Sequence, residues 1–91
     1  MPVTLRLPTV LAKSAGGKTI HEASGATVGD VVADVATRFP DLGPRLRDGK
    51  GEPYTYVIFY LDDEDIRFQK GFATPVADGA EIVVVPAIAG G

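Results

Sequence analysis

One amphipathic helical stripe lies between segments of strand-like character, and this pattern restricts the fold of the chain more than any other. In the segment ATVGDVVADVATRFPDL, apolar residues recur at the spacing of one helix face, at Val28, Val31, Val32, Val35 and Phe39. Thr27 is placed to cap the N-terminus of this helix, and Pro40 is placed to end it. Because valine has a low helix propensity, we expect the helix to depend on packing against a sheet.

Two apolar segments near the ends of the chain predict the strongest strands. Residues 2–8 (PVTLRLP) alternate apolar and polar side chains, as a half-buried strand does. Residues 81–86 (EIVVVP) follow a turn at Asp78 and Gly79 and are almost continuously apolar, which predicts a central strand.

The remaining segments predict shorter elements. Gly16 and Gly17 separate two strand-like runs, so we expect a loop or hairpin that returns through a second strand at 18–22. Residues 42–53 are rich in Gly, Pro and charge, and predict an insertion with a short helical turn or an irregular loop. Residues 56–61 predict a strand, followed by an acidic turn at 62–65 and a short return strand.

This order of elements predicts an α+β fold. One helix is available to cover one face of a mixed sheet of four to five strands, and parallel pairing of the first and last strands at the centre buries both of them. The arrangement is a β-grasp, or ubiquitin-like, fold. We expect residues 1–86 to form the domain and residues 87–91 to form a flexible C-terminal tail.

Composition excludes several classes of function. The chain has 91 residues, no cysteine and a formal net charge of −3. Disulfides, thiolate metal sites and cysteine nucleophiles are therefore absent, and no basic cluster favours nucleic acid or anionic lipid. No apolar run is long enough to cross a bilayer, and the N-terminal residues do not form a signal-peptide pattern. We expect a cytoplasmic protein that is monomeric when free.

No side-chain constellation predicts catalysis. Ser14, Ser24 and His21 are the candidates for nucleophilic chemistry, and the strand context of His21 favours a surface position. The acidic run at 62–65 lacks the ligand spacing of a calcium loop, so we expect a solvated hairpin turn. The glycine-rich stretches do not match a phosphate-binding loop. We expect no catalytic residue, no metal and no bound cofactor.

The last five residues, AIAGG, are the remaining candidate. Pro86 cannot donate a ladder hydrogen bond, so we expect the strand to end there and the tail to lack a strand partner: Ala87, Ile88, Ala89, Gly90 and Gly91. One interpretation is an ordinary frayed terminus. The other is a tail that a partner threads through a narrow channel, since glycine passes where a side chain would clash. In the second interpretation, the carboxylate of Gly91 reaches the far end of the channel.

These features together resemble a known family. Asp78 and Gly79 before the last strand, and the pattern P-x-x-x-GG at Pro86, Gly90 and Gly91, are similar to the ubiquitin-like sulfur carriers. That family includes the molybdopterin synthase small subunit and the thiamin-pathway carrier (ThiS/MoaD-like). The segments DDEDIRFQKGFATPVADGAEIVVVPAIAGG and LPTVLAKSAGG, and the long insertion RLRDGKGEPYTYV, resemble its CysO-type branch, which serves actinobacterial cysteine synthesis.

The resemblance implies a carrier rather than an enzyme. An E1-like adenylating enzyme of the MoeB/ThiF type would use ATP to activate the Gly91 carboxylate, and a sulfur donor would convert it to a thiocarboxylate. A downstream sulfur-accepting synthase would then take the sulfur for cysteine, cofactor or secondary-metabolite synthesis. Ala87, Ile88, Ala89 and Gly90 would thread into these partners.

The resemblance also implies a docking face. We expect Val57, Phe59 and Leu61 to face the helix, which leaves four apolar side chains on the opposite face of the sheet: Ile58, Tyr60, Val83 and Val85. Members of the family dock their activating enzyme through this face. Two alternatives remain open: a ubiquitin-like modifier joined to lysines through Gly91, and a β-grasp interaction module with an incidental tail.

Overall fold

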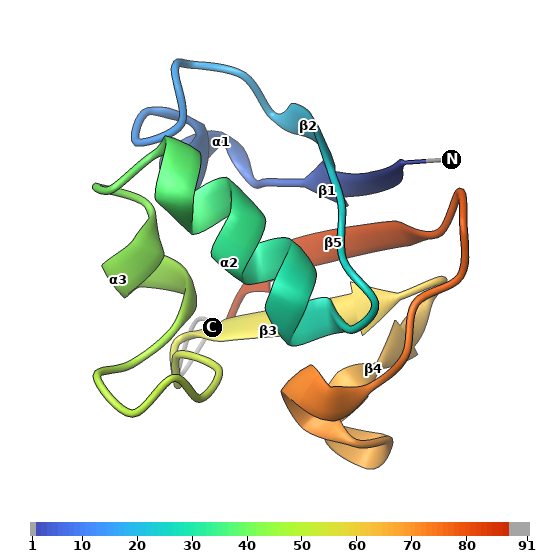
Figure 1. Ribbon diagram of the computed structural model, residues 1–91. Helices are drawn as coiled ribbons and strands as arrows, with labels where there is room; N and C mark the ends of the chain where they lie inside the picture. Colours follow the sequence, from blue (N-terminus) through green and yellow to red (C-terminus); the bar gives the residue numbers. More distant parts are fainter. Residues whose placement is uncertain (1, 88–91) are drawn as a thin grey trace.

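Five strands form one mixed sheet in the computed structural model, which describes residues 2–87. The strands lie in the order β2-β1-β5-β3-β4 (Figure 1) and have these bounds: β1 (Val3–Arg6), β2 (Ile20–Ala23), β3 (Val57–Leu61), β4 (Glu64–Asp65) and β5 (Glu81–Pro86). β1 and β5 pair in parallel at the centre, and the other pairs are antiparallel. The predicted central pairing of the first and last strands is therefore confirmed.

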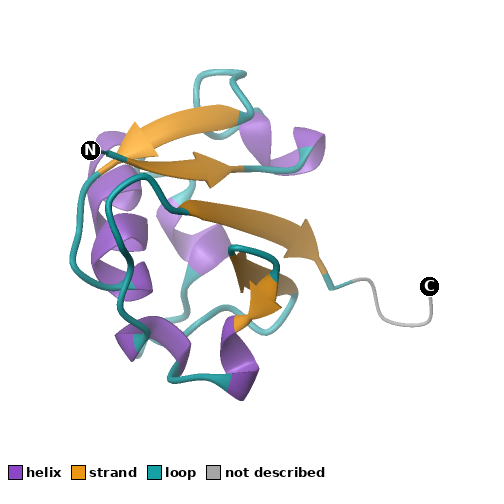
Figure 2. Cartoon of the chain, turned by 90° about the vertical axis from the view of Figure 1, so that its right-hand side faces the viewer, coloured by secondary structure: helices purple, strands orange, loops and turns teal. Residues whose placement is uncertain are grey.

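Helix α2 (Val28–Arg38) lies across one face of this sheet (Figures 1 and 2). The Oγ1 of Thr27 accepts a hydrogen bond from the backbone N–H of Asp30 at 3.2 Å, so the predicted N-cap is confirmed. The four valines of the stripe are completely buried, at Val28, Val31, Val32 and Val35. The sheet supplies the packing that a valine-rich helix requires.

Two four-residue helices and two 3₁₀ turns complete the described fold: α1 (Thr9–Ala12), α3 (Gly43–Leu46), η1 (Ile66–Phe68) and η2 (Gly71–Ala73). α3 confirms the predicted helical turn in the insertion. The strand-like interpretation of the segment after Pro8 was wrong, because the Pro8 carbonyl accepts hydrogen bonds from the N–H groups of Leu11 and Ala12 and closes α1. This turn leaves Val10 64% exposed.

The hairpin that joins β3 to β4 has a shorter turn than the predicted 62–65. Asp62 and Asp63 have φ angles of 47° and 73°, and Glu64 already pairs with Leu61. Two consecutive positive φ values are typical of the tight turn that matches strand twist, and Asp tolerates them better than most residues. Asp62 also accepts a hydrogen bond from the backbone N–H of Glu81 at 3.0 Å, so it anchors the start of β5.

His21 is buried, and its predicted surface position was wrong. Its side chain lies on the helix side of β2, where the ring packs edge-on against Phe39 with centroids 5.1 Å apart. The Nε2 of His21 lies 2.8 Å from the carbonyl oxygen of Lys18 and donates to it, since a carbonyl can only accept. The period-2 pattern of β2 therefore buries His21 and Ala23 and exposes Ile20 and Glu22.

Candidate functional site: the outer sheet face and the end of β5

The outer face of the sheet carries four apolar side chains in two cross-strand pairs. Ile58 of β3 lies opposite Val85 of β5, and Tyr60 lies opposite Val83. Residues directly opposite each other in an antiparallel pair lie on the same face. The alternate β3 residues, Val57, Phe59 and Leu61, are buried, so the predicted orientation of this strand is confirmed. We call the set Ile58, Tyr60, Val83 and Val85 the outer apolar face.

Two ion pairs border the outer apolar face. Arg6, the β1 neighbour of Val83, donates to Glu81 with Nη2 and Oε2 3.0 Å apart. Across the sheet, Asp65 pairs with Tyr60 in the hairpin and accepts a 2.7 Å hydrogen bond from Nη2 of Arg67. The Arg67 side-chain hydrogen bonds lower the pKa of the Asp65 carboxyl below its ordinary value. The charges beside the apolar side chains are thus largely neutralised within the protein.

β5 lies in the middle of the sheet, between β1 and β3, and the C-terminal residues follow it directly in the chain. The strand ends at Pro86, as predicted. The backbone N–H of Ala87 nevertheless donates to the carbonyl oxygen of Tyr56, one residue before β3, at 2.9 Å, so Ala87 is held by a hydrogen bond although it lies beyond the strand. The other predicted tail residues, Ile88, Ala89, Gly90 and Gly91, lie outside the described residues.

An apolar hollow lies beside the point where β5 ends. It has a volume of about 220 Å³ and we call it the exit hollow; its walls come from α1, α3, the approach to β3 and the end of β5, through Val10, Leu11, Pro44, Arg45, Tyr54, Tyr56, Val57 and Pro86. The rings of Tyr54 and Tyr56 pack edge-on with centroids 5.4 Å apart. Sequence reasoning missed this feature, because its residues come from four separate segments.

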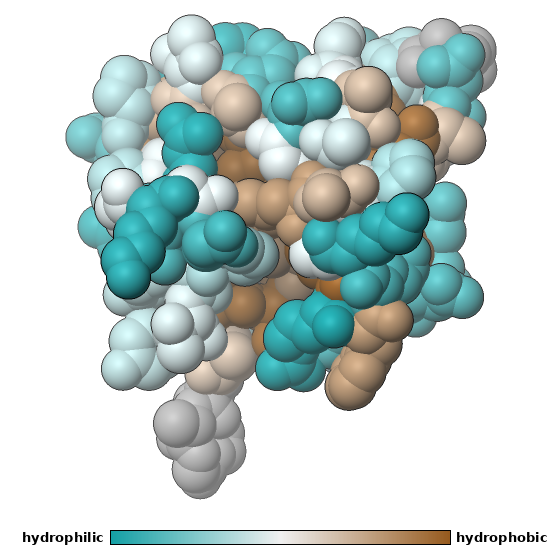
Figure 3. Space-filling view, turned by 60° about the horizontal axis from the view of Figure 1, so that its bottom comes forward, coloured by the Kyte–Doolittle hydropathy of each residue, from teal (hydrophilic) through white to brown (hydrophobic). Residues whose placement is uncertain are grey.

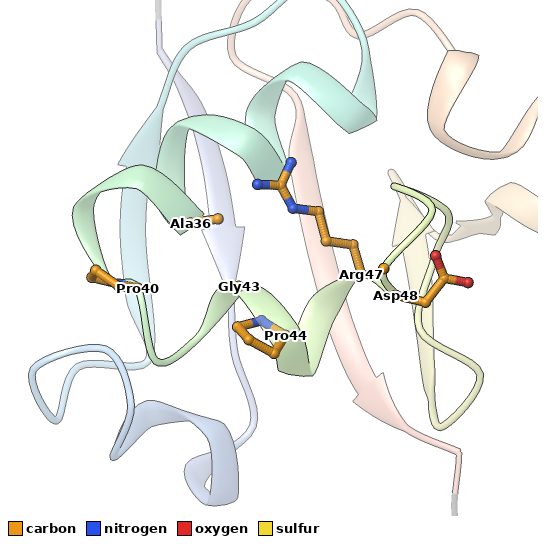
Figure 4. Close-up of a pocket in the computed structure, with 7 residues that line it drawn as sticks. Ala36, Pro40, Gly43, Pro44, Arg47 and Asp48 are labelled. Atoms are coloured by element: carbon orange, nitrogen blue, oxygen red, sulfur yellow. The ribbon is translucent and has the colours of Figure 1, made fainter.

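Two further hollows lie along the insertion. One, of about 280 Å³, lies between the end of α2 and α3 and is lined in part by Ala36, Pro40 and Gly43 (Figure 4). The Oδ1 of Asp48 at its rim accepts hydrogen bonds from the N–H groups of Lys50 and Glu52, so this carboxylate shapes its own turn. The other, of about 270 Å³, lies between residues 53–55 and η1.

Figure 3 shows the molecule with the lower side of Figure 1 turned toward the viewer. On this side, apolar surface lies in a hollow between hydrophilic groups.

The side-chain candidates do not form a catalytic group. Ser14 lies in the turn after α1, and the partner of the His21 ring is the Lys18 carbonyl rather than a serine hydroxyl. The backbone N–H of Ser24 donates to Asp34. Among residues 2–87, no three His, Asp or Glu side chains gather in a way that could hold a metal ion. No helix within that range is long and apolar enough to cross a bilayer.

Comparison with known proteins identifies the family of the chain. The sequence matches the ThiS family model over residues 5–91. The chain belongs to the ThiS family. This match covers the β-grasp core and continues through the last residue of the sequence, and it confirms the resemblance drawn from the residues.

The similar proteins within this group include sulfur carriers and a modifier. The chain is 40% identical over 93 residues to sulfur carrier protein CysO of Mycobacterium tuberculosis, with all of both chains covered. A crystal structure of the Amycolatopsis orientalis BexX/CysO complex contains a chain that matches with a TM-score of 0.90 and 37% identity, covering 98% of this chain and 99% of that one. Small archaeal modifier protein 3 of Haloferax volcanii is 31% identical over 94 residues, again with full coverage of both. The structural match agrees with the sheet order and the helix across it: this chain has the ubiquitin-like β-grasp fold.

Proposed function

We propose that this protein is a sulfur carrier whose Gly91 carboxylate is adenylated by an E1-like enzyme and converted to a thiocarboxylate. The observation that carries the proposal is the full-length similarity to CysO, together with a family match that includes Gly91. The proposal places the reaction in the cytoplasm, because the activating step consumes ATP. The protein acts as a co-substrate and binds no cofactor of its own.

The proposed chemistry has two displacements. A carboxylate oxygen of Gly91 attacks the α-phosphorus of ATP, and pyrophosphate leaves. A sulfide-level sulfur donor then attacks the acyl carbon, and AMP leaves with the electron pair of the broken C–O bond. The product is a thiocarboxylate, whose sulfur stays nucleophilic and is held on a protein until a downstream synthase positions it against an acceptor.

The described structure supports this role because it has an exposed apolar surface to which a partner can bind. The outer apolar face is a two-strand group of half-exposed and exposed apolar side chains, and such groups usually mark binding sites. β5 connects this face directly to the C-terminal residues. A relative, CysO of Amycolatopsis orientalis, forms a complex with a second protein, BexX, which supports a carrier that docks on partner proteins.

Mass spectrometry tests the proposal. The protein is incubated with its cognate E1-like enzyme, ATP and sulfide, and the intact mass is measured. A carrier gains the mass difference between sulfur and oxygen, and the gain requires both ATP and Gly91. No ATP-dependent change in mass and no consumption of ATP would instead indicate an interaction module with an incidental tail.

A ubiquitin-like modifier is the second candidate function, favoured by the 31% identity to small archaeal modifier protein 3. Its activating step is the same, but the amine of a target lysine then attacks the acyl carbon of Gly91, an isopeptide bond forms and AMP leaves. In cell extract supplied with ATP, a modifier appears as higher-mass conjugates that depend on Gly91. The higher identity to CysO, 40%, favours the carrier.

A further inference from the structure

The exit hollow is a second apolar surface at the C-terminal end of β5, distinct from the outer apolar face. Two of its large side chains are mostly exposed, with Val10 at 64% and Tyr56 at 61%. Pro86 forms one wall of the hollow, and the Tyr56 carbonyl accepts the hydrogen bond from Ala87. The hollow therefore lies directly beside the last described residue of the chain.

The lining of the exit hollow has a simple chemistry. Of the eight described residues that line it, seven are uncharged and the eighth is Arg45. Within residues 2–87, the Arg45 guanidinium makes no ion pair or side-chain hydrogen bond, whereas the guanidinium groups of Arg6, Arg38 and Arg67 do. A guanidinium that has no partner among the described residues, beside an apolar hollow in a protein of net negative charge, favours a ligand that brings both an apolar group and a carboxylate.

The position of the hollow favours an enzyme as its occupant. An enzyme that encloses Gly91 must approach the chain within four residues of Ala87, a span of at most about 14 Å for extended backbone. Such an enzyme covers the surface beside Pro86, and the exposed Tyr56 and Val10 are the apolar side chains that it meets there. Burying them on association removes apolar surface from water.

We propose that the exit hollow receives an apolar side chain, flanked by a carboxylate, from the E1-like enzyme that activates Gly91. The inference rests on the proposed function, and it adds the exit hollow to the outer apolar face as a second surface that contacts the enzyme. The enzyme would then contact this protein on two sides of the end of β5, at the outer apolar face and at the exit hollow. These two contacts fix the direction in which the C-terminal residues enter the enzyme, which matters because reaction rates are sensitive to misplacement of about 1 Å.

The test measures ATP–pyrophosphate exchange as a function of carrier concentration, with the cognate E1-like enzyme and the full-length chain. The variants are Val10→Asp and Arg45→Glu, with Arg45→Lys as the conservative variant and Phe68→Asp as the matched control. Phe68 is 84% exposed and lies in η1, outside both surfaces. Thermal unfolding verifies that each variant is folded, which is expected because Val10 and Phe68 are largely exposed.

The inference predicts a rise of about tenfold in KM for Val10→Asp and for Arg45→Glu, with kcat close to that of the unmodified chain. Arg45→Lys should retain most of the affinity, and Phe68→Asp should retain all of it. The effect of Arg45→Glu should shrink as salt is raised, because a rim charge is screened. Calorimetric titration of the enzyme with each variant should show the same order.

Three outcomes overturn the inference. Unchanged KM for both Val10→Asp and Arg45→Glu removes the hollow from the interface while the proposed function stands. A lower KM for both variants, together with altered amide relaxation of residues 88–91 in the free protein, indicates that the chain's own C-terminal residues occupy the hollow. A full-length chain that supports no exchange contradicts the proposed function itself, and this inference with it.

Discussion

The backbone N–H of Ala87 donates a hydrogen bond to the carbonyl oxygen of Tyr56 across 2.9 Å. Tyr56 and Ala87 lie one residue outside β3 and β5, next to the last strand pair, Val57 and Pro86. The sheet therefore holds the chain until four residues before Gly91, and the carboxylate lies within about 14 Å of this anchor. For a partner that docks on β3 and β5, the Gly91 carboxylate is therefore within a bounded distance of the docking surface.

The outer apolar face should be required for binding to the activating enzyme. Replacing Ile58 or Tyr60 with Asp places a charge where the interface is expected to exclude water, which should weaken binding by about tenfold or more. Both side chains are only partly buried, so the variants should still fold. Titration calorimetry with the enzyme measures the affinity, and circular dichroism checks the fold.

Phe68→Asp is the control for this experiment, because Phe68 is more exposed than any residue of the outer apolar face. Its affinity should match that of the unmodified protein. If Ile58→Asp and Tyr60→Asp also bind with unchanged affinity, the outer apolar face is not part of the interface.

Gly25 should tolerate no side chain. A Cβ at this position would lie 2.7 Å from the backbone nitrogen of Val31 and 2.7 Å from the Cβ of Asp30, at the first turn of α2. Gly25→Ala therefore forces a backbone shift at the capped end of the helix, and should destabilise the fold by about 1–3 kcal/mol. Urea unfolding measures the difference.

Gly49→Ala is the matched control. A Cβ on Gly49 meets nothing within 4 Å, so the added methyl should leave stability unchanged or raise it by a few tenths of a kcal/mol. Equal unfolding midpoints for Gly25→Ala and Gly49→Ala would show that the loop before α2 can move away without cost.

The Asp65–Arg67 pair should give the protein a component of stability that depends on pH. The pKa of Asp65 is lowered by the Arg67 side-chain hydrogen bonds, so the unfolded chain binds the proton more readily than the folded one. This contribution is fully present at pH values above the ordinary pKa of Asp, and it is lost as pH falls through the lower pKa of the folded state. Arg67→Gln should remove most of the contribution and move the pKa of Asp65 toward its ordinary value, while the backbone N–H of residue 67 still donates to Asp65.

Carboxyl NMR titration of Asp65 checks this directly. Arg47→Gln removes a guanidinium that does not contact Asp65, and should leave the titration unchanged. A pKa of Asp65 that is the same with and without Arg67 would contradict the assignment of the shift to this pair.

Much of the fold could be predicted because the strongest patterns depend on local periodicity. The stripe from Val28 to Val35 and the apolar run of β5 each identify an element and its buried side. Their arrangement follows, since a helix between two apolar strands allows a right-handed crossover and a parallel pair. The two-residue β4 could be placed only approximately, because its acidic sequence has a low strand propensity and the positive φ angles of Asp62 and Asp63 fix its pairing.

Other features could not be predicted because tertiary contacts decide them. The burial of His21 depends on the ring of Phe39 and on the Lys18 carbonyl, and neither is visible in a period-2 pattern. The four residues of α1 are too few for a helical period to be recognised. The exit hollow exists only because the insertion returns beside α1 and the end of β5. Proline at position 86 predicted where the ladder ends, but not that Ala87 would still donate to Tyr56.

Deletion of Gly91 tests the central claim most directly. ATP–pyrophosphate exchange and thiocarboxylate formation are measured with the cognate activating enzyme on three chains: full-length, truncated by Gly91, and extended by one residue. Truncation moves the carboxylate by up to about 3.5 Å along the chain, far more than near-attack geometry tolerates, so both activities should essentially disappear. The extended chain should be equally inactive, and all three should unfold at the same temperature. Exchange and thiocarboxylate formation by the truncated chain at the full-length rate would contradict the sulfur-carrier account.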